Sequence, residues 1–231
     1  WLMKSIKPQI DPNKKPVNVK QAFIKQCSNM EKAIADISHI SNAKTEIELK
    51  NTLTLQRKEF VDLIITSPPY VTSYEYADLH QLTTLWLDYV EDYRDLRKDT
   101  IGSNHNRSID DGFKLLNCVG KDIVNDLKKV DKSKARAVAK YYLDMQKITD
   151  VCNLSLTKNG MLIMVIGNTE YKGVQIDNVR HLTASMQNSG FSEIYVTKRK
   201  MSGKSLTPYR DKFGRFSSNP NMRKIYSEEF I

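Results

Sequence analysis

The feature that most constrains the fold is an apolar run that stops abruptly at two consecutive prolines. Residues 61–65 read Val-Asp-Leu-Ile-Ile, and Thr66-Ser67-Pro68-Pro69-Tyr70 follows them. A short apolar run that ends at a turn signal predicts a buried β-strand. The prolines fix two φ angles and remove two N–H donors, and the residue before a proline is held extended. We therefore expect a stiff turn at the end of a buried strand.

A second apolar run, residues 161–166, ends at Gly167-Asn168-Thr169. Apolar residues at helical spacing predict amphipathic helices over residues 19–40, 77–87, 133–156 and 177–188. Buried strands that alternate with such helices predict an α/β domain with a mainly parallel sheet. Because ligands of these sheets bind beyond the carboxyl ends of the strands, the two turns are expected to meet at one edge.

The other segments carry weaker signals. We expect short strands at residues 45–51, 194–196 and 225–231, the last one antiparallel, and we expect Asn159-Gly160 to end the helix that precedes the second run. Residues 88–132 read as a polar excursion with short helical pieces such as 123–127. A single domain over 1–231 would thus comprise a basic arm and helix (1–44), strands and turn (45–87), the excursion (88–132) and a helix–strand remainder (133–231) that includes a basic loop at 198–224.

Composition narrows the class of protein. A formal charge of +9 and a pI near 9.3 favour a polyanionic partner, although a generally basic proteome would give the same balance. No apolar stretch approaches the ~18 residues of a membrane helix. Cys27, Cys118 and Cys152 lack the spacing of a disulfide framework or a zinc site, which favours a reducing cytoplasm and no metal. The chain begins at Trp1 without a signal peptide, so we expect a fragment or a processed chain.

The proline turn suits a planar group that carries an amine. Ser67 supplies a hydroxyl, Pro69 holds the carbonyl of Pro68 in a fixed direction, and Tyr70 offers a ring for stacking. A nucleobase amine is a weak nucleophile because its lone pair is delocalised into the ring. Acceptors that hold both N–H bonds and align the nitrogen with a methyl donor would favour direct methyl transfer. A base within a duplex reaches such a site only after it flips out.

Each residue near the turn has a structural interpretation as well. The turn itself can be a strand terminator without function. Tyr74 and Tyr76 can shape a base pocket or pack beneath the loop, and Asn168 can contact the substrate or only close its own turn. We expect His80 to be a polar neighbour rather than a base, and Trp86 to lie in the core.

Residues 61–70, VDLIITSPPY, resemble the catalytic motif of the amino-methyltransferases, and the serine form is similar to that of the cytosine-N4 group. Longer blocks are similar to one branch of bacterial site-specific DNA methylases: SPPYVTSYEYADLHQLTTLWL, RDLRKDTIGS, KARAVAKYYLDMQK, VIGNTEYKGVQIDN and LTPYRDKFGRFSSN. Together the blocks span most of the chain. The resemblance implies a partial Rossmann-like fold that depends on S-adenosylmethionine, with Ser67, Pro68, Pro69 and Tyr70 as the catalytic loop.

The chain also departs from that family. The family binds S-adenosylmethionine chiefly through a Phe-x-Gly-x-Gly loop, and the sequence contains no such motif. Near Asn51, where the family often has an acidic residue that contacts the adenine amine, the chain reads Lys50-Asn51-Thr52. Asn51 and Thr66 are therefore the candidate cofactor contacts in this chain. The main cofactor motif is expected on an N-terminal segment or on a separate chain.

The sequence predicts the catalytic portion of a DNA methyltransferase that modifies the exocyclic amine of a flipped base in double-stranded DNA, cytosine N4 in the first place. Adenine N6, an RNA or protein amide substrate, and a non-catalytic nucleic-acid- or partner-binding half of a split enzyme are the alternatives. The candidate substrate-binding residues are Tyr74, Tyr76, Asn168, Lys198, Arg199, Lys200 and Arg210.

Overall fold

The computed structural model describes residues 13, 15–38, 44–71, 75–98, 100–103, 112–200, 209–210, 223–224 and 228–230. The chain divides into two compact units, Trp1–Leu49 and Lys50–Ile231. We describe each unit by itself. None of the described helices combines the length and the apolar character needed to cross a membrane.

In the first unit, the described residues contain one helix, α1 (Val19–Ile37). Its N-terminus is capped by Asn18, whose side chain accepts a hydrogen bond from the backbone N–H of Gln21 at 3.1 Å. The predicted helix at residues 19–40 is thus confirmed over 19–37, and 39–40 lie outside the described residues. The strand predicted at 45–51 is wrong, because residues 44–51 form no ladder.

The second unit is built on a parallel pair of strands, β1 (Val61–Thr66) and β2 (Leu156–Met164). Ile64 lies opposite Leu162 and Thr66 opposite Met164, and an irregularity falls between Val61 and Leu63. The pair confirms an α/β arrangement with parallel pairing. A parallel connection needs a long crossover, and here it runs through several helices.

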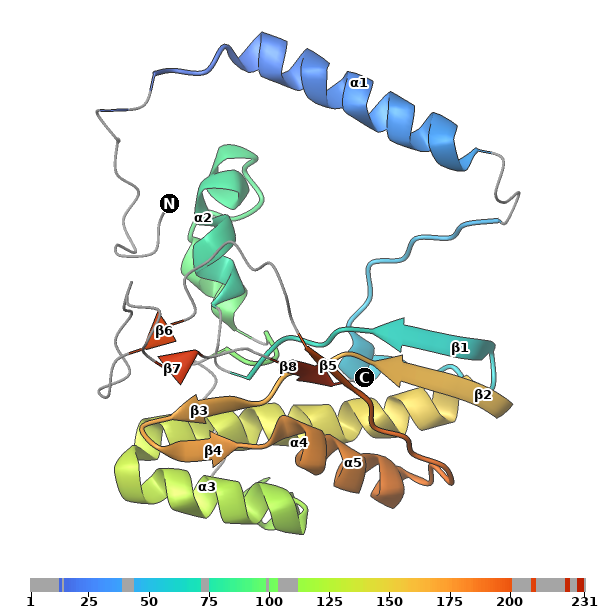
Figure 1. Ribbon diagram of the computed structural model, residues 1–231, viewed down its shortest axis with the longest axis vertical. Helices are drawn as coiled ribbons and strands as arrows, with labels where there is room; N and C mark the ends of the chain where they lie inside the picture. The colour runs from blue at the N-terminus through green and yellow to red at the C-terminus, as the bar shows by residue number, and fades with distance from the viewer. Residues whose placement is uncertain are drawn as a thin grey trace. The chain divides into compact units, whose positions relative to one another are not determined.

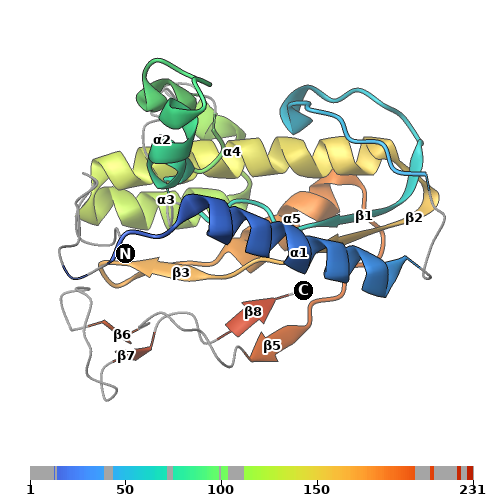
Figure 2. The ribbon, with the colours of Figure 1, turned by 90° about the horizontal axis from the view of Figure 1, so that it is seen from above.

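The crossover and the segment after β2 supply a helical layer. Helices α3 (Cys118–Val130), α4 (Lys132–Ser155) and α5 (Asn178–Ser189) pack against one another on one side of the β1–β2 pair (Figures 1 and 2). Helix α4 confirms the helix predicted at 133–156, and it buries a stripe of residues at helical spacing: Val138, Tyr142, Met145, Thr149 and Cys152. Helix α3 extends well beyond the short piece expected in the 88–132 excursion, because five of its residues are buried and four of them join the hydrophobic core.

The junction between α4 and β2 differs from the prediction. The helix ends at Ser155 and β2 begins at Leu156, so Asn159-Gly160 lies inside the strand instead of ending the helix. Leu156 is buried and has an extended backbone. A Cβ atom on Gly160 would lie 2.8 Å from Cδ2 of Leu156. Glycine at this position therefore lets the side chain of Leu156 pack close to the strand backbone.

The expectation that the first strand is buried is wrong for one of its faces. Ile64 packs on the core, whereas Leu63 is 49% exposed and Ile65 is 67% exposed. On the neighbouring strand Met161 is 60% exposed. An apolar run is typical of a strand covered on both sides, but within this unit the helices α3, α4 and α5 cover one side.

Short elements complete the unit. Helix α2 (Tyr76–Trp86) confirms the predicted helix at 77–87, and three 3₁₀ turns lie at η1 (Thr52–Thr54), η2 (Tyr93–Arg97) and η3 (Gly112–Leu115). Three antiparallel pairs join β3 (Thr169–Tyr171) to β4 (Val174–Ile176), β5 (Lys198–Lys200) to β8 (Glu228–Phe230), and β6 (Tyr209–Arg210) to β7 (Arg223–Lys224). The C-terminal strand predicted at 225–231 is present over 228–230 and is antiparallel, but it pairs with β5 in a sheet separate from β1 and β2, and 225–227 and 231 lie outside the described residues. Among the described strands only β1 and β2 pair in parallel, so the expected mainly parallel sheet is reduced to that pair. The strand predicted at 194–196 is wrong, since these residues are irregular.

Candidate functional site

The proline turn extends directly from the carboxyl end of β1. The carbonyl of Thr66 accepts a hydrogen bond from the N–H of Val165 at 2.9 Å, which continues the pairing of the two strands. Beyond it Ser67 is exposed, Pro68 is buried, and Pro69 and Tyr70 are half-buried. The turn therefore presents its hydroxyl outward on a backbone that is anchored by one buried proline.

The two predicted turns meet, as the sequence analysis expected. A Cβ atom on Gly167 would lie 3.9 Å from Cε2 of Tyr70, so the tyrosine ring rests against the turn that follows β2. Asn178 on α5 holds that turn through a 2.7 Å hydrogen bond from its side-chain amide to the carbonyl of Gly167. The ring of Tyr70 is thus positioned by two strands and a helix.

The back of the turn is closed by a segment that sequence reasoning missed. Gly102 has a φ of +83°, and a Cβ atom there would lie 3.4 Å from the carbonyl oxygen of Tyr70, 3.8 Å from Cβ of Pro69 and 3.6 Å from the ring of Tyr141. Tyr141 is 1% exposed, and burial raises the pKa of its phenol. Gly102 in RDLRKDTIGS was the only sequence signal for this close contact with the turn. The polar composition of residues 88–132 gave no reason to expect it.

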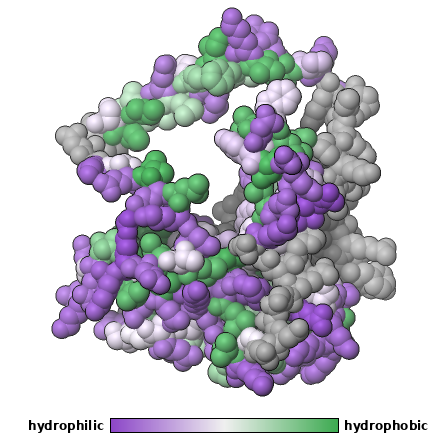
Figure 3. All heavy atoms as spheres, turned by 180° about the vertical axis from the view of Figure 1, so that it is seen from behind, coloured by the Kyte–Doolittle hydropathy of each residue, from purple (hydrophilic) through white to green (hydrophobic). Residues whose placement is uncertain are grey.

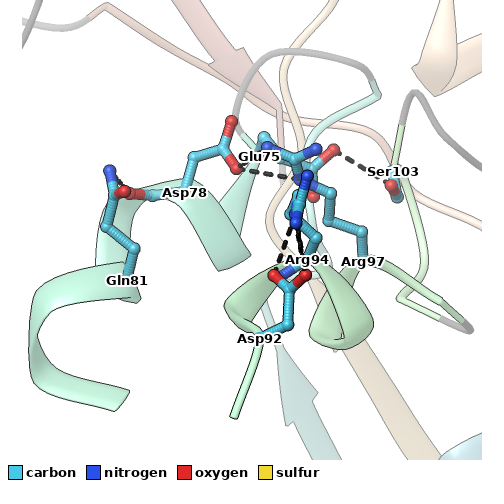
Figure 4. A network of polar contacts seen from close by, with 7 residues as sticks. All are labelled: Glu75, Asp78, Gln81, Asp92, Arg94, Arg97 and Ser103. Atoms are coloured by element: carbon cyan, nitrogen blue, oxygen red, sulfur yellow. Dashed lines mark hydrogen bonds and ion pairs between the residues drawn. The ribbon is translucent and has the colours of Figure 1, made fainter. Parts of the chain in front are cut away.

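A polar network surrounds the start of α2 (Figure 4). Ser103 donates a 2.9 Å hydrogen bond from Oγ to Oε2 of Glu75. Arg97 on η2 pairs with Asp78 in the first turn of α2, and Nε of the arginine lies 2.9 Å from Oδ1 of the aspartate. This ion pair is largely shielded from solvent, so it fixes η2 against α2 more firmly than a surface pair would.

A second ion pair of the network faces solvent. Arg94 donates from Nε to both carboxylate oxygens of Asp92 at 2.9 Å. These hydrogen bonds lower the pKa of Asp92 to about 2. Asp92 also caps η2 by accepting from the backbone N–H of Arg94. These contacts of Asp92 are therefore local to η2.

Two predicted contact residues are occupied by local hydrogen bonds. Asn168 donates from Nδ2 to Asp177 at 2.9 Å and accepts at Oδ1 from the N–H of Val179 at 3.1 Å. Of its two interpretations, the geometry favours closing the turn. Asn51 caps η1 by accepting from the N–H of Leu53 at 3.0 Å. Asn51 and Thr66 stand at opposite ends of the segment that contains β1.

The remaining predicted residues are dispersed. Tyr76 is half-buried at the start of α2, and Tyr74 lies outside the described residues. Lys198 and Arg199 are exposed on β5, while Lys200 and Arg210 belong to β5 and β6 but their side chains are not among those described. Trp86 is 86% exposed, so the expectation that it lies in the core is wrong. Hydrophobic side chains are visible over α2 in Figure 3.

A cavity of about 370 Å³ lies away from the proline turn. It is bounded by residues 53–56 and by the C-terminal half of α4, including Lys147 and Asp150. The start of β1 lies beside the end of α4, since the N–H of Glu59 bonds to the carbonyl of Leu154. The cavity is therefore near the amino ends of the strands, whereas the proline turn occupies the carboxyl ends.

Comparison with known proteins does not assign this chain to a family. No protein-family model, no curated protein and no solved structure matches this chain.

Proposed function

We propose that this chain is the acceptor-binding portion of a DNA amino-methyltransferase, with cytosine N4 as the first candidate target. The observation that carries the proposal is the geometry of the turn at the carboxyl end of β1. Its serine hydroxyl is exposed, its prolines stiffen the backbone, and the ring of Tyr70 rests against the turn after β2. A base with an exocyclic amine would find acceptors and a stacking surface in one place.

The proposed chemistry needs positioning more than reactive side chains. Ser67 Oγ and the carbonyl of Pro68 would accept the two N–H bonds of the amine, which favours a localised lone pair on nitrogen. Stacking on Tyr70 would fix the plane of the base so that the nitrogen points at the methyl donor. S-adenosylmethionine, when bound, supplies an electrophilic methyl group on a positive sulfur. As the nitrogen forms its bond to the methyl carbon, the bond between that carbon and sulfur would break, the cofactor would leave as a neutral thioether, and the amine would then release a proton.

The cofactor site would be completed by a segment outside this chain. Two apolar residues of β1 and one of β2 are exposed on the side away from the helical layer: Leu63, Ile65 and Met161. Within the described residues, β1 pairs with β2 on one edge and with no strand on the other. Both features support an N-terminal segment or separate chain that would bring the glycine-rich motif next to β1.

Double-stranded DNA is the proposed partner because of the charge of the chain. The net charge is +9, and Lys198 and Arg199 are exposed on β5. Lysine and arginine contacts to phosphates give affinity without sequence information. A non-catalytic half that only docks DNA would share this charge, so methyl transfer must be measured directly.

The test of the chemistry uses the complete enzyme, with the cofactor-binding portion present. Ser67→Ala removes one acceptor and Tyr70→Ala removes the stacking ring, so each variant is expected to lose methyl transfer by at least about a hundredfold while DNA binding persists. Nucleosides from treated DNA are analysed by mass spectrometry, which also separates N4-methylcytosine from N6-methyladenine.

Matched controls come from the same chain. Ser192→Ala and Tyr195→Ala change the same residue types at exposed positions outside the turn, and both are expected to keep full activity. Full activity in Ser67→Ala and Tyr70→Ala would overturn the proposed roles. N6-methyladenine as the sole product would replace cytosine by adenine as the target.

A further inference from the structure

Helix α1 of the first unit exposes an apolar face along its whole length. None of its 19 residues is buried. The apolar side chains that are 55–78% exposed are Val19, Phe23, Ile24, Met30, Ile34 and Ile37, and hydrophobic side chains are visible along this helix in Figure 3. In proteins most of the stability of a helix comes from the packing of such a face. The apolar face of α1 therefore calls for a partner.

The apolar residues of α1 repeat at the spacing of a two-helix seam. Phe23, Met30 and Ile37 follow one another at intervals of seven residues. Cys27 and Ile34 form a second row, offset from the first by four residues. Alternating steps of three and four residues place both rows on one stripe, which is the pattern of helices that pack knobs into holes. The stripe is thus complementary to a second helix with the same pattern.

Most charged residues of α1 lie outside this stripe. Lys25 and Lys32 lie on the opposite face of the helix, and Asp36 is also outside the two rows. Lys20 is the exception, because it precedes Cys27 by seven residues and begins the second row. With three lysines and two acidic residues, α1 has little net charge to attract it to anionic lipid. The stripe therefore suits an apolar protein surface.

The charges at the two ends of α1 favour an antiparallel pair. Lys20 lies in the first turn, whereas Asp36 lies in the last turn, which contains no basic residue. Each charge is thus at the end of the helix where the macrodipole disfavours it. A parallel pair would place Lys20 beside Lys20 of the second copy. An antiparallel pair would instead place it at the last turn of that copy, near Asp36 and the carbonyl groups of the helix end.

The exposed area is sufficient for a reversible dimer. Burial of the exposed apolar side chains of α1 would remove on the order of 600 Å² of surface per copy from water. Two copies together would then reach the lower limit of specific interfaces, about 1,200 Å². We therefore expect a dissociation constant in the micromolar range.

We propose that α1 is a dimerisation helix that packs antiparallel against α1 of a second copy of this chain. Phe23 would face Ile34 of the second copy. Cys27 would face Met30 of that copy, near the middle of the helix. Because both copies use the same surface, the contact closes with two-fold symmetry and adds no third copy. Association through α1 does not depend on the proposed methyl transfer.

Sedimentation equilibrium of the full chain in reducing buffer measures the association. The parent, with a chain mass of 26.6 kDa, is expected to change from monomer to dimer over the micromolar range. Phe23→Ala and Ile34→Ala each remove a seam side chain but raise helix propensity, because alanine is the best helix former. Since a symmetric dimer carries each substitution twice, each variant is expected to raise the dissociation constant at least about tenfold.

A matched control comes from outside the stripe. Asn29 is exposed, and Asn29→Ala is expected to keep the dissociation constant within about twofold of the parental value. Far-UV circular dichroism shows whether each variant keeps its helix content. A parent that stays monomeric throughout the micromolar range, or seam variants that associate as the parent does, would overturn the proposal. Equal weakening by Asn29→Ala would also overturn it.

Disulfide trapping tests the orientation of the two helices. Phe23→Cys and Ile34→Cys are made in separate chains in which Cys27 and the exposed Cys118 are replaced by serine. A mixture of the two chains is expected to form a disulfide-linked dimer under mild oxidation, whereas neither chain alone does so. In an antiparallel pair the two copies of residue 23 lie about 16 Å apart along the helix axis, which is too far for a disulfide. Self-linked dimers in the separate samples would show a parallel pair and overturn the antiparallel arrangement.

Discussion

At the scale of single residues, His181 on α5 is a titratable group that lies in the core. It is fully buried, its ring stacks on Tyr142 with centroids 3.7 Å apart, and its Nε2 lies 3.4 Å from Oε1 of Gln146. Burial lowers the pKa of His181 to about 3. The folded protein therefore holds this imidazole neutral at every pH at which the unfolded chain would begin to protonate it.

The depressed pKa of His181 predicts a loss of stability in mild acid. Below about pH 6.5, the ordinary histidine pKa, the unfolded chain binds a proton that the folded chain does not bind. The stability that the neutral His181 contributes is therefore complete above that pH and is lost as the pH falls toward 3. From pH 7 to pH 5, protonation of this histidine in the unfolded chain should lower the free energy of unfolding by about 2 kcal/mol. Urea denaturation at the two pH values measures the change.

A pair of histidine variants isolates this effect from the titration of carboxylates. His181→Gln is expected to show a shallower dependence on pH than the parent, whatever its stability at pH 7. His80→Gln replaces an exposed histidine and is expected to keep the parental dependence. Equal pH dependence in the parent and in His181→Gln would show that His181 is not held neutral.

At the scale of secondary-structure elements, one residue links three helices. Asn117 caps α3 by accepting from the N–H of Gly120 at 2.8 Å, and its Nδ2 donates to the carbonyl of His181 and to Oγ of Ser185 on α5. Its own N–H donates to Gln146 on α4 at 2.9 Å. Asn117 therefore caps α3 and also joins it by hydrogen bonds to α4 and α5.

Asn117→Ala is expected to lower the free energy of unfolding by roughly 2–4 kcal/mol, because it removes the cap of α3 and both buried hydrogen bonds from its side-chain amide to α5. Urea denaturation measures the change. Asn125 lies on the exposed face of the same helix, so Asn125→Ala controls for helix propensity. If Asn117→Ala lowers the free energy of unfolding no more than Asn125→Ala does, Asn117 does not join the helices as described.

The elements show where sequence reasoning succeeds. The helix predicted at 177–188 is confirmed because both of its ends carry local signals: Asp177 accepts from the N–H of Arg180, and Gly190 has a φ of +102°. The end of α4 was missed because Asn159-Gly160 is a turn signal that tertiary packing overrides. Local dipeptides cannot reveal that Leu156 is buried as the first residue of a strand.

The candidate site divides in the same way. The proline turn and its meeting with Gly167 follow from strand ends, which sequence patterns mark well. The contact between Glu75 and Ser103 joins residues 28 positions apart, and the segment between them has neither apolar periodicity nor a turn motif. Such a contact depends on tertiary packing, so the structure was needed to find it.

At the scale of the whole molecule, the exposed face of the β1–β2 pair is the largest departure from expectation. The apolar run of β1 has the composition of a strand covered on both sides, but Leu63 and Ile65 face away from the helical layer. The α/β class could be predicted from the alternation of apolar runs with amphipathic helices. The number of strands in the sheet could not, because strand pairing is a property of the assembled molecule.

The missing glycine-rich motif predicts weak cofactor binding by residues 1–231 alone. Isothermal titration with S-adenosylmethionine is expected to give no measurable heat of binding at micromolar concentrations. Restoring the cofactor-binding portion should restore affinity in the same experiment. Micromolar affinity of the isolated chain would contradict our division of the site between two segments.

Helix α4 passes into β2 without a connecting residue. This continuous stretch of chain carries two supports of the proline turn. Tyr141 on α4 reaches its back through Gly102, and Gly167, just beyond β2, supports the ring of Tyr70. Both supports of Tyr70 therefore belong to one stretch of chain, and we expect a displacement of α4 along its axis to affect both of them.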